Sequence, residues 1–395
     1  MRGHRSRRRS TFGKRTCVTI AAAASVGCAS VNQNLSRTCH SGSCLTYSTW
    51  GQKIDSTIGN KAVGYSYIII NNGLAMESKA HGKARTSSDA PQLGMTLDLR
   101  SNAASVSKTM TAVAALKLLA AKNVSVGSAI GPYLPSSWQL GQGVGQITFA
   151  ELLTHTSGIR DTLSPDVSFA NLKKTMAQDI VPANKVSKYQ NANFALFRIL
   201  IPYLNGFNDA GVQDIAGATD QRYLNYMNSV YNPDIQIKCK PGVNPVLSYP
   251  YPAGSTHGTD WGDWTDLCGS GGLQLSVTDM GVFMAHLMLG IYLPKTSNNP
   301  MVTTLPTMVS QKYGWDYTYP STYGTCVVKN GDLGGGNPFV PILSSLYVYC
   351  PDTGLAFVGL ANSTLPVQAT HSYGFSGALD DIVYQTYMAS WKAQP

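Results

Sequence analysis

The first strand-like pattern in the chain lies at residues 62–70 (A-V-G-Y-S-Y-I-I-I), which are rich in β-branched and aromatic residues. The tripeptide Asn71-Asn72-Gly73 follows and favours a tight hairpin turn. A second strand is therefore expected near residues 74–82. Strand-like runs return late in the chain, at residues 324–329, 345–350 and 355–360.

The middle of the chain has helical patterns instead. Residues 105–121 are dominated by Ala, Leu, Met and Lys, which favour helix. Residues 31–60 are polar and irregular, which suggests a linker. Further helices are expected at residues 148–154, 167–178, 192–204, 219–230, 276–289 and 376–391. This order predicts an α+β fold, with an antiparallel sheet flanked by helices and an all-helical region inserted at about residues 105–235.

Composition supports a large, folded body. Of the 395 residues, 43% are hydrophobic and only 13% are charged, which argues against disorder. The net charge of +9 comes largely from residues 1–15, which hold seven Arg and Lys residues and no acid. The remainder is nearly neutral and gives little support for nucleic-acid binding.

The N-terminus has the pattern of an export signal. Its basic segment is followed by an apolar run at residues 17–24 and by small residues up to Ser30. This run is too short to span a membrane, so no transmembrane segment is expected. We therefore expect a signal at residues 1–30, a segment at 31–60 and one domain at 61–395. An alternative to cleavage near Ser30 is lipid attachment at Cys28, which Ser25 makes a poorer match.

The cysteine count is consistent with an oxidising compartment. Six of the eight Cys lie after the signal, an even number that allows 15 disulfide pairings. We expect the pairs Cys39–Cys44, Cys239–Cys268 and Cys326–Cys350. The chain contains no C-x-x-C motif, so a structural zinc site is not expected, and it contains no phosphate loop or H-E-x-x-H motif, so neither another metal nor a cofactor is expected.

The first motif with chemical potential is Ser105-Val106-Ser107-Lys108 at the start of a predicted helix. Residues three apart share a helix face, so the Lys108 amine can reach the Ser105 hydroxyl and activate it. The helix N-terminus also offers N–H groups to an oxyanion. An S-x-x-K sequence is common by chance, and a helix cap with an exposed lysine is the alternative.

Two more motifs follow. In Tyr189-Gln190-Asn191, the tyrosine is a candidate proton acceptor and donor, and Asn191 is a candidate hydrogen-bond partner for lysine. In Lys329-Asn330-Gly331, the lysine can attract a substrate carboxylate and the glycine permits close approach to the backbone. Taken alone, these motifs equally fit a core tyrosine, a helix cap and an exposed turn.

The three motifs together, in the order S-x-x-K, Y-x-N and K-x-G, resemble the serine hydrolase superfamily of class C β-lactamases, D-alanyl-D-alanine carboxypeptidases (penicillin-binding proteins) and related esterases. The resemblance covers roughly residues 60–390. Longer similar strings lie at residues 103–116, 124–135, 147–159, 269–280 and 351–355.

This resemblance implies specific roles. Ser105 would form the acyl-enzyme, Lys108 and Tyr189 would share the general-base work, and Asn191 would orient them. Lys329 and Gly331 would bind substrate, and the N–H groups of Ser105 and Asp332 would form the oxyanion hole. His155, in T-H-T-S-G, is expected to be structural rather than a triad base.

The chain departs from the usual K-T-G at two positions. Asn330 replaces the threonine whose hydroxyl helps to bind a carboxylate, and Asp332 stands where a small residue is expected. Asp332 either points away, because alternate strand residues face opposite sides, or points inward and disfavours anionic substrates. The expected function is acyl transfer from a D-Ala-D-Ala peptide, an ester or amide, or a β-lactam. The alternative is a binding or sensing protein without turnover.

Overall fold

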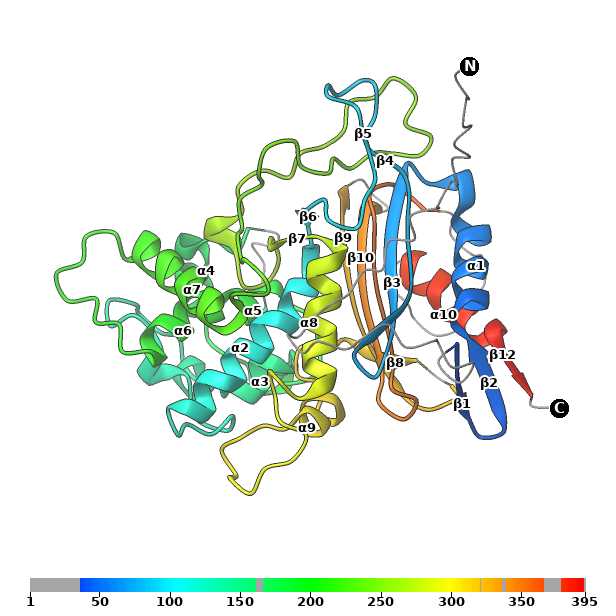
Figure 1. Ribbon diagram of the computed structural model, residues 1–395. Coiled ribbons are helices and arrows are strands. Elements are labelled where there is room, and N and C mark those ends of the chain that lie inside the picture. Colours follow the sequence, from blue (N-terminus) through cyan, green and yellow to red (C-terminus); the bar gives the residue numbers. More distant parts are fainter. Residues whose placement is uncertain (1–35, 161–165, 320, 336–338, 366–377, 394–395) are drawn as a thin grey trace, which may run out of the picture.

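The structure, a computed structural model, describes residues 36–160, 166–319, 321–335, 339–365 and 378–393. Its centre is a seven-stranded antiparallel sheet with the strand order β5-β4-β3-β11-β10-β9-β8 (Figure 1). This confirms the α+β fold expected from the sequence. The strands are β3 (Gly64–Asn71), β4 (Leu74–Arg85), β5 (Leu93–Gly94), β8 (Tyr317–Tyr319), β9 (Cys326–Gly335), β10 (Val340–Cys350) and β11 (Leu355–Ala361).

Both faces of the sheet are buried, which explains why its central strands are apolar throughout. In β3, Tyr65, Tyr67 and Ile69 face one core, while Ile68 and Ile70 face the other. Helices α1 (Tyr47–Ile58) and α10 (Ala378–Ser390) cover the first face, and α8 (Val277–Leu289) packs on the second (Figure 1).

The helical region lies beyond α8 and surrounds α2 (Ser107–Ala121) (Figure 1). Nearly every residue of α2 is buried, including the polar Lys108 of its first turn, so the helix has no solvent-exposed polar face. The stretch Ala104–Ala121 is long and apolar enough to cross a membrane, but 78% of it is buried within the protein, as in a core helix. Around it lie α3 (Phe149–Leu153), α4 (Phe169–Met176), α5 (Asn191–Ala195), α6 (Phe197–Leu204) and α7 (Ile215–Tyr231).

The segment preceding β3 differs from the sequence-based expectation. Instead of an irregular linker, residues 36–60 include the hairpin β1 (Arg37–His40) and β2 (Ser43–Thr46), followed by α1. The buried residues of α1, which recur on one helical face, are Tyr47, Trp50, Gly51, Ile54 and Ile58. The polar residues between them hid an amphipathic helix, which packs on α10 and β4.

Several short elements were also absent from the prediction. They include α9 (Leu305–Ser310), β6 (Ser101–Asn102), β7 (Gln274–Leu275), β8 and β12 (Trp391–Ala393). The helix expected at residues 192–204 is divided into α5 and α6 at Leu196. Elements of two to six residues offer too few positions for a clear period, which explains why the sequence did not reveal them.

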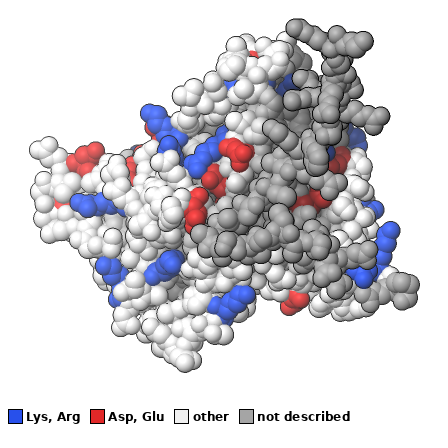
Figure 2. Space-filling view, viewed as in Figure 1, with Lys and Arg blue, Asp and Glu red and all other residues white. Residues whose placement is uncertain are grey.

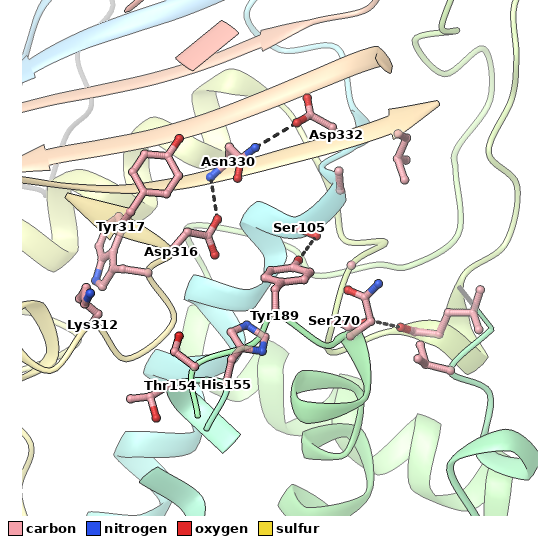
Figure 3. A pocket seen from close by; sticks show the side chains of 18 of the residues that line it. Ser105, Thr154, His155, Tyr189, Ser270, Lys312, Asp316, Tyr317, Asn330 and Asp332 are labelled. Carbon is pink, nitrogen blue, oxygen red and sulfur yellow. Dashed lines mark hydrogen bonds between the residues drawn. The ribbon is translucent and has the colours of Figure 1, made fainter. Parts of the chain in front are cut away.

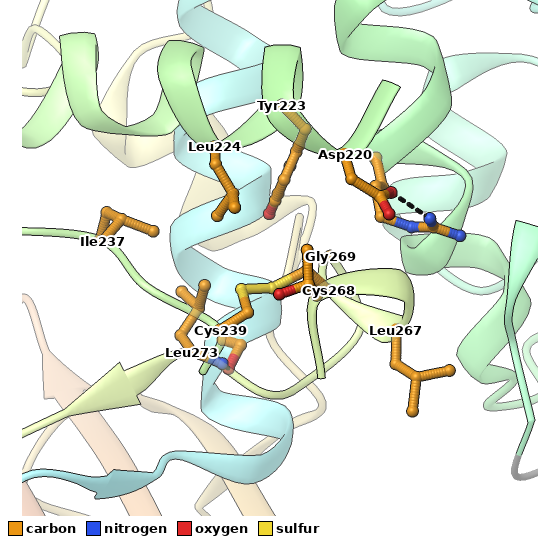
Figure 4. Close-up of a disulfide and its surroundings, with 12 residues drawn as sticks. Asp220, Tyr223, Leu224, Ile237, Cys239, Leu267, Cys268, Gly269 and Leu273 are labelled. Carbon is orange, nitrogen blue, oxygen red and sulfur yellow. Dashed lines mark hydrogen bonds and ion pairs between the residues drawn. A yellow bond between two sulfur atoms is a disulfide. The ribbon is translucent and has the colours of Figure 1, made fainter. Parts of the chain in front are cut away.

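Three disulfides join the six cysteines in the expected pairs. Cys39–Cys44 closes the β1–β2 hairpin, and Cys326–Cys350 joins β9 to β10. Cys239–Cys268 ties the segment after α7 to the turn that precedes Ser270, beside α2 (Figure 4). The expected export signal at residues 1–30 and the alternative lipidation site Cys28 lie outside the described residues.

Candidate active site

Ser105 lies in a tight turn at the start of α2. A 3₁₀ turn, Ala104–Val106, precedes the helix, and Ala104 has a φ of 45°, which is unusual for a residue with a side chain. This conformation is fixed because the Ala104 N–H donates to Asn102 Oδ1 at 2.9 Å and Ser107 Oγ donates to the Ala104 carbonyl at 2.7 Å. The turn places Ser105 on the wall of a cleft of about 1170 Å³.

Lys108 is fully buried on the first turn of α2 and is surrounded by oxygen atoms. Its Nζ lies 2.9 Å from Ser105 Oγ, 2.8 Å from Asn191 Oδ1 and 2.5 Å from the Ser270 carbonyl oxygen. Burial lowers the pKa of Lys108 well below its usual value, and the positive charge of Lys329 lowers it further. This shift favours the neutral amine, which is the form that can accept a proton, while the Asp316 carboxylate opposes it.

The three oxygen atoms around Lys108 Nζ can accept hydrogen bonds from all three N–H groups of an ammonium, and the same geometry also suits a neutral amine. In the neutral form, its two N–H groups can donate to Asn191 Oδ1 and to the Ser270 carbonyl. The remaining lone pair then faces Ser105 Oγ and can accept its proton. The sequence thus correctly placed Ser105, Lys108 and Asn191 together, while Ser270 was missed because its contribution is a backbone carbonyl.

Tyr189 is the second side chain that contacts the Ser105 hydroxyl. Its hydroxyl donates to Ser105 Oγ at 2.7 Å, and the ring centre lies 4.8 Å from Lys108 Nζ (Figure 3). Desolvation raises the pKa of the Tyr189 hydroxyl, and the Asp316 carboxylate raises it further, although 45% of the residue is exposed. The raised pKa favours the phenol form, in which the hydroxyl donates to Ser105 Oγ.

His155 supports the tyrosine without touching the serine. Its ring centre lies 4.5 Å from that of Tyr189, and its Nδ1 accepts hydrogen bonds from the Gln190 N–H at 3.3 Å and from Asn193 Nδ2 at 3.1 Å. Burial lowers the pKa of His155 well below its usual value. A neutral ring that anchors the Tyr189-Gln190-Asn191 segment agrees with the structural role expected from the sequence.

Lys329 is almost completely buried and forms an ion pair inside the protein. Its Nζ donates to Asp316 Oδ1 at 2.7 Å and Oδ2 at 2.8 Å, and it lies 4.9 Å from the centre of the Tyr189 ring. Burial lowers the pKa of Lys329, and the Asp316 carboxylate counters this by raising it. The lysine expected to attract a substrate carboxylate already has a carboxylate partner.

Gly331 lets β9 pack closely against the 3₁₀ turn that carries Ser105. A Cβ at this position would lie 2.6 Å from the Ser105 nitrogen and 2.9 Å from the Val106 nitrogen, too close for any side chain. We expected the glycine to admit substrate, and the structure shows that it admits the backbone of the 3₁₀ turn. This contact places the Ser105 N–H beside the edge of β9.

The N–H of Asp332 faces the same open edge of β9. The Asn330 N–H, two residues earlier, points away from β10 and donates to Asp316 Oδ2 at 3.3 Å. Because N–H groups two residues apart on a strand point to the same side, the Asp332 N–H also points into the cleft. This arrangement fits the expected oxyanion pair of Ser105 and Asp332.

Because alternate residues of a strand face opposite sides, the side chain of Asp332 lies on the opposite face of β9 from Lys329. It still lines the cleft (Figure 3). Its carboxylate accepts from Ser344 Oγ at 2.6 Å and from Asn330 Nδ2 at 3.0 Å. Burial raises the pKa of Asp332 to about 6. The side-chain amide of Asn330 is therefore bound to a carboxylate of the protein itself.

Aromatic and apolar side chains form much of the remaining cleft wall. Trp264 is fixed by the hydrogen bond from its Nε1 to the Trp261 carbonyl, at 2.8 Å. Sequence analysis missed this wall and missed Asp316, because neither has a characteristic spacing from the three motifs. The apolar lining comprises Val167, Trp261, Trp264, Leu267, Trp315, Leu333 and Phe339. Across the described ranges, no three His, Cys, Asp or Glu side chains come together as metal ligands.

The fold is that of the β-lactamase-type serine hydrolases, and the site contains an S-x-x-K motif of the kind found in that class. A family model described as Beta-lactamase matches residues 52–374, so the chain belongs to the beta-lactamase family. The resemblance stated from the sequence motifs is thereby confirmed.

Solved structures with this fold come from several organisms. The β-lactamase/D-alanine carboxypeptidase from Pseudomonas syringae has a TM-score of 0.60 at 15% identity, covering 88% of this chain and 98% of its own. The class C β-lactamase from Rhodobacter sphaeroides has a TM-score of 0.57 at 17% identity, covering 86% and 98%. The octameric penicillin-binding protein homologue from Pyrococcus abyssi has a TM-score of 0.56 at 16% identity, covering 86% and 75%. No curated protein matches the chain significantly.

Proposed function

We propose that the protein is a serine hydrolase that cleaves an ester or amide through an acyl-enzyme on Ser105. The observation that carries this proposal is the convergence of two groups, an amine and a phenol, on one serine oxygen atom. Lys108 Nζ lies 2.9 Å and the Tyr189 hydroxyl 2.7 Å from Ser105 Oγ, on the wall of an open cleft. A hydroxyl in contact with both a base and a proton donor is arranged for nucleophilic attack.

In the first half-reaction, Ser105 Oγ attacks the carbonyl carbon while its proton passes to Lys108 Nζ. The oxygen of the tetrahedral intermediate accepts hydrogen bonds from the N–H groups of Ser105 and Asp332. When the intermediate collapses, the bond to the leaving group breaks. The leaving group takes a proton from the Tyr189 hydroxyl, which is refilled from Lys108.

In the second half-reaction, water attacks the acyl-enzyme. Lys108 accepts the water proton through Tyr189, and the new oxyanion uses the same two N–H groups. Ser105 Oγ then leaves and recovers its proton from Lys108. The carboxylic acid product departs and the starting protonation states are restored.

The candidate substrates remain D-Ala-D-Ala peptides, esters or amides, and β-lactams. The similar structures include proteins described as β-lactamase/D-alanine carboxypeptidase and as class C β-lactamase, and this supports acyl transfer as the common chemistry. The substrate is proposed to be a small molecule or peptide. A nucleic acid is not the proposed partner. Figure 2 is consistent with this, since Lys and Arg lie in small separate groups over the face that it shows, whereas a phosphate backbone is bound by clustered Lys and Arg.

Labelling with a fluorescent fluorophosphonate tests the proposal. Wild-type protein is expected to be labelled on Ser105, and Ser105→Ala is expected to lose the label. Ser187→Ala is the matched control, because Ser187 also lines the cleft but belongs to none of the three motifs. Labelling that persists in Ser105→Ala would contradict the assignment. A folded wild type that no serine probe labels would instead favour a binding or sensing protein without turnover.

We also propose that the protein is exported. The basic and apolar pattern of residues 1–30 supports this, and so do the three disulfides, which persist in oxidising compartments. Mass spectrometry of the mature N-terminus after expression in a secreting host tests it. Cleavage near Ser30 is expected, and an intact Met1 terminus on cell-retained protein would overturn the proposal.

A further inference from the structure

We propose that two carboxylates of the protein, Asp316 and Asp332, occupy the groups that would otherwise bind a substrate carboxylate, so that the enzyme selects uncharged esters or amides. The inference rests on the proposed function and names the substrate class of the same site. Its starting point is the strand side of the cleft, where β9 carries Lys329, Asn330 and Asp332.

Asp316 neutralises Lys329. The Lys329 ammonium donates to both oxygens of this carboxylate, at 2.7 and 2.8 Å, and only 1% of the lysine is exposed. The pair carries no net charge whichever partner holds the proton. An incoming carboxylate would have to displace Asp316 from a buried contact, which leaves Asp316 without its partner and costs free energy.

Asp332 similarly accepts the side-chain hydrogen bond that Asn330 could otherwise donate to a substrate. The Asn330 amide donates to Asp332 Oδ2 at 3.0 Å, and its backbone N–H donates to Asp316 Oδ2 at 3.3 Å (Figure 3). Asn330 therefore bridges the two acids. Its donors point to groups that already carry negative charge, so an anionic substrate group placed there would be repelled.

The other charged groups that line the cleft do not reverse this balance. Asp166 adds another negative charge, and the exposed Lys312 adds one positive charge. An exposed lysine is screened by water and contributes little to binding an anion. Lys108 is directed at Ser105, Asn191 and Ser270 and is not available to a substrate carboxylate.

The apolar wall provides the alternative source of binding free energy. Trp264, Trp315 and Phe339 line the cleft together with Leu267. Such surfaces stabilise an aromatic or aliphatic substituent by removing it from water. The substrate class that fits both walls is an uncharged ester or amide with an apolar acyl or leaving group.

A matched pair of aryl esters tests the inference. In 3-carboxyphenyl phenylacetate and 3-carbamoylphenyl phenylacetate, the leaving groups have similar shape and differ in charge. Wild-type protein is expected to hydrolyse the carbamoyl ester with a kcat/KM about tenfold or more above that of the carboxyl ester. Asp316→Asn frees Lys329 for a charge-assisted hydrogen bond, so this ratio should fall by about tenfold or more.

Asp166→Asn is the matched control, because it removes one carboxylate from the same cleft at a site that does not contact Lys329. An equal change of the ratio in this variant would overturn the inference, as would no change in folded Asp316→Asn. Should Asp316→Asn fail to fold, Asp332→Asn should shift the ratio in the same direction by a smaller factor.

The wild type alone separates the two proposals. If it hydrolyses neither ester faster than Ser105→Ala does, the proposed function fails. If it hydrolyses both but prefers the carboxyl ester, only the assignment of substrate class fails.

Discussion

On the helical side of the cleft, Lys108 has three oxygen partners and one of them is the hydroxyl of Ser105, the proposed nucleophile. On the strand side, by contrast, Lys329 and Asn330 are bound to carboxylates of the protein. The first side preserves the arrangement that the motifs led us to expect. The second side keeps the lysine and the glycine but changes their environment. Under the proposed function, the side chains that transfer protons and the side chains that would bind substrate can vary independently, because the helical region carries the first set and β9 carries the second.

The largest loss of activity is expected on the helical side, when the Lys108 side chain is removed. Lys108→Ala is expected to lower kcat/KM for an aryl ester by about 10³-fold, because the base that accepts the Ser105 proton is lost. Initial-rate assays with an aryl ester measure the loss of kcat/KM, and circular dichroism checks that the variant is folded. Lys117→Ala, on the same helix with its Nζ hydrogen-bonded to the Tyr292 carbonyl, should keep its activity. A comparable loss in both variants would mean that α2 itself was disturbed.

The disulfide between Cys326 and Cys350 tests how far the strand side depends on its cross-link. Replacing both residues by Ala should lower the free energy of unfolding by about 3 kcal/mol, because the bond closes a loop of 24 residues. Urea unfolding measures the change. Removing Cys39–Cys44, which closes a loop of 5 residues, should cost less, about 2 kcal/mol. The reverse order would show that the β9–β10 pair is held mainly by other contacts.

The buried carboxylate of Asp332 should make the strand side sensitive to pH. Its pKa is raised from 3.8 to about 6, so the folded state binds this proton more tightly than the unfolded state does. The resulting stabilisation is present below pH 4 and is lost as the pH rises through about 6. Asp332→Asn has no charge to desolvate.

The variant should therefore gain about 1–3 kcal/mol relative to wild type between pH 4 and pH 8. Urea unfolding at the two pH values provides the measurement. A stability difference between wild type and variant that is the same at both would show that Asp332 is ionised without penalty.

The smallest expected effect links the two sides through the charge of Lys329. The pKa of Lys108 is lowered by burial and by Lys329, and it is raised by Asp316. Activity should rise with pH as Lys108 loses its proton, with an apparent pKa well below 10.5. In Asp316→Asn this acidic limb should move to lower pH, because the Lys329 charge is no longer balanced. A shift to higher pH in the kcat/KM profile would contradict the coupling.

The sequence predicted the helical side well because its signals are local. Ser105 and Lys108 are three residues apart at the start of a long apolar helix, and Tyr189 and Asn191 flank the start of another. Asp316 escaped detection because it reaches Lys329 through the hairpin of β8 and β9, and β8 has only three residues. The helix α1 was missed because its buried positions are separated by polar residues.

The fold as a whole followed from longer patterns. The hairpin of β3 and β4 was predicted from β-rich residues and the Asn71-Asn72-Gly73 turn, and the structure places the turn there. The hydrogen-bond partners of the β9 side chains could not be predicted from the sequence, because alternate residues of a strand at a sheet edge can face either the core or the cleft. Only the three-dimensional neighbours of Asn330 and Asp332 decide this.

The central claim is that Ser105 carries the acyl group, and rapid-quench mass spectrometry of wild-type protein mixed with 3-carbamoylphenyl phenylacetate measures this directly. The account predicts a transient phenylacetyl adduct on the peptide that contains Ser105, appearing before steady-state turnover and absent from Ser105→Ala. Release of the phenol with the adduct on a different residue, or with the same rate in Ser105→Ala, would contradict it.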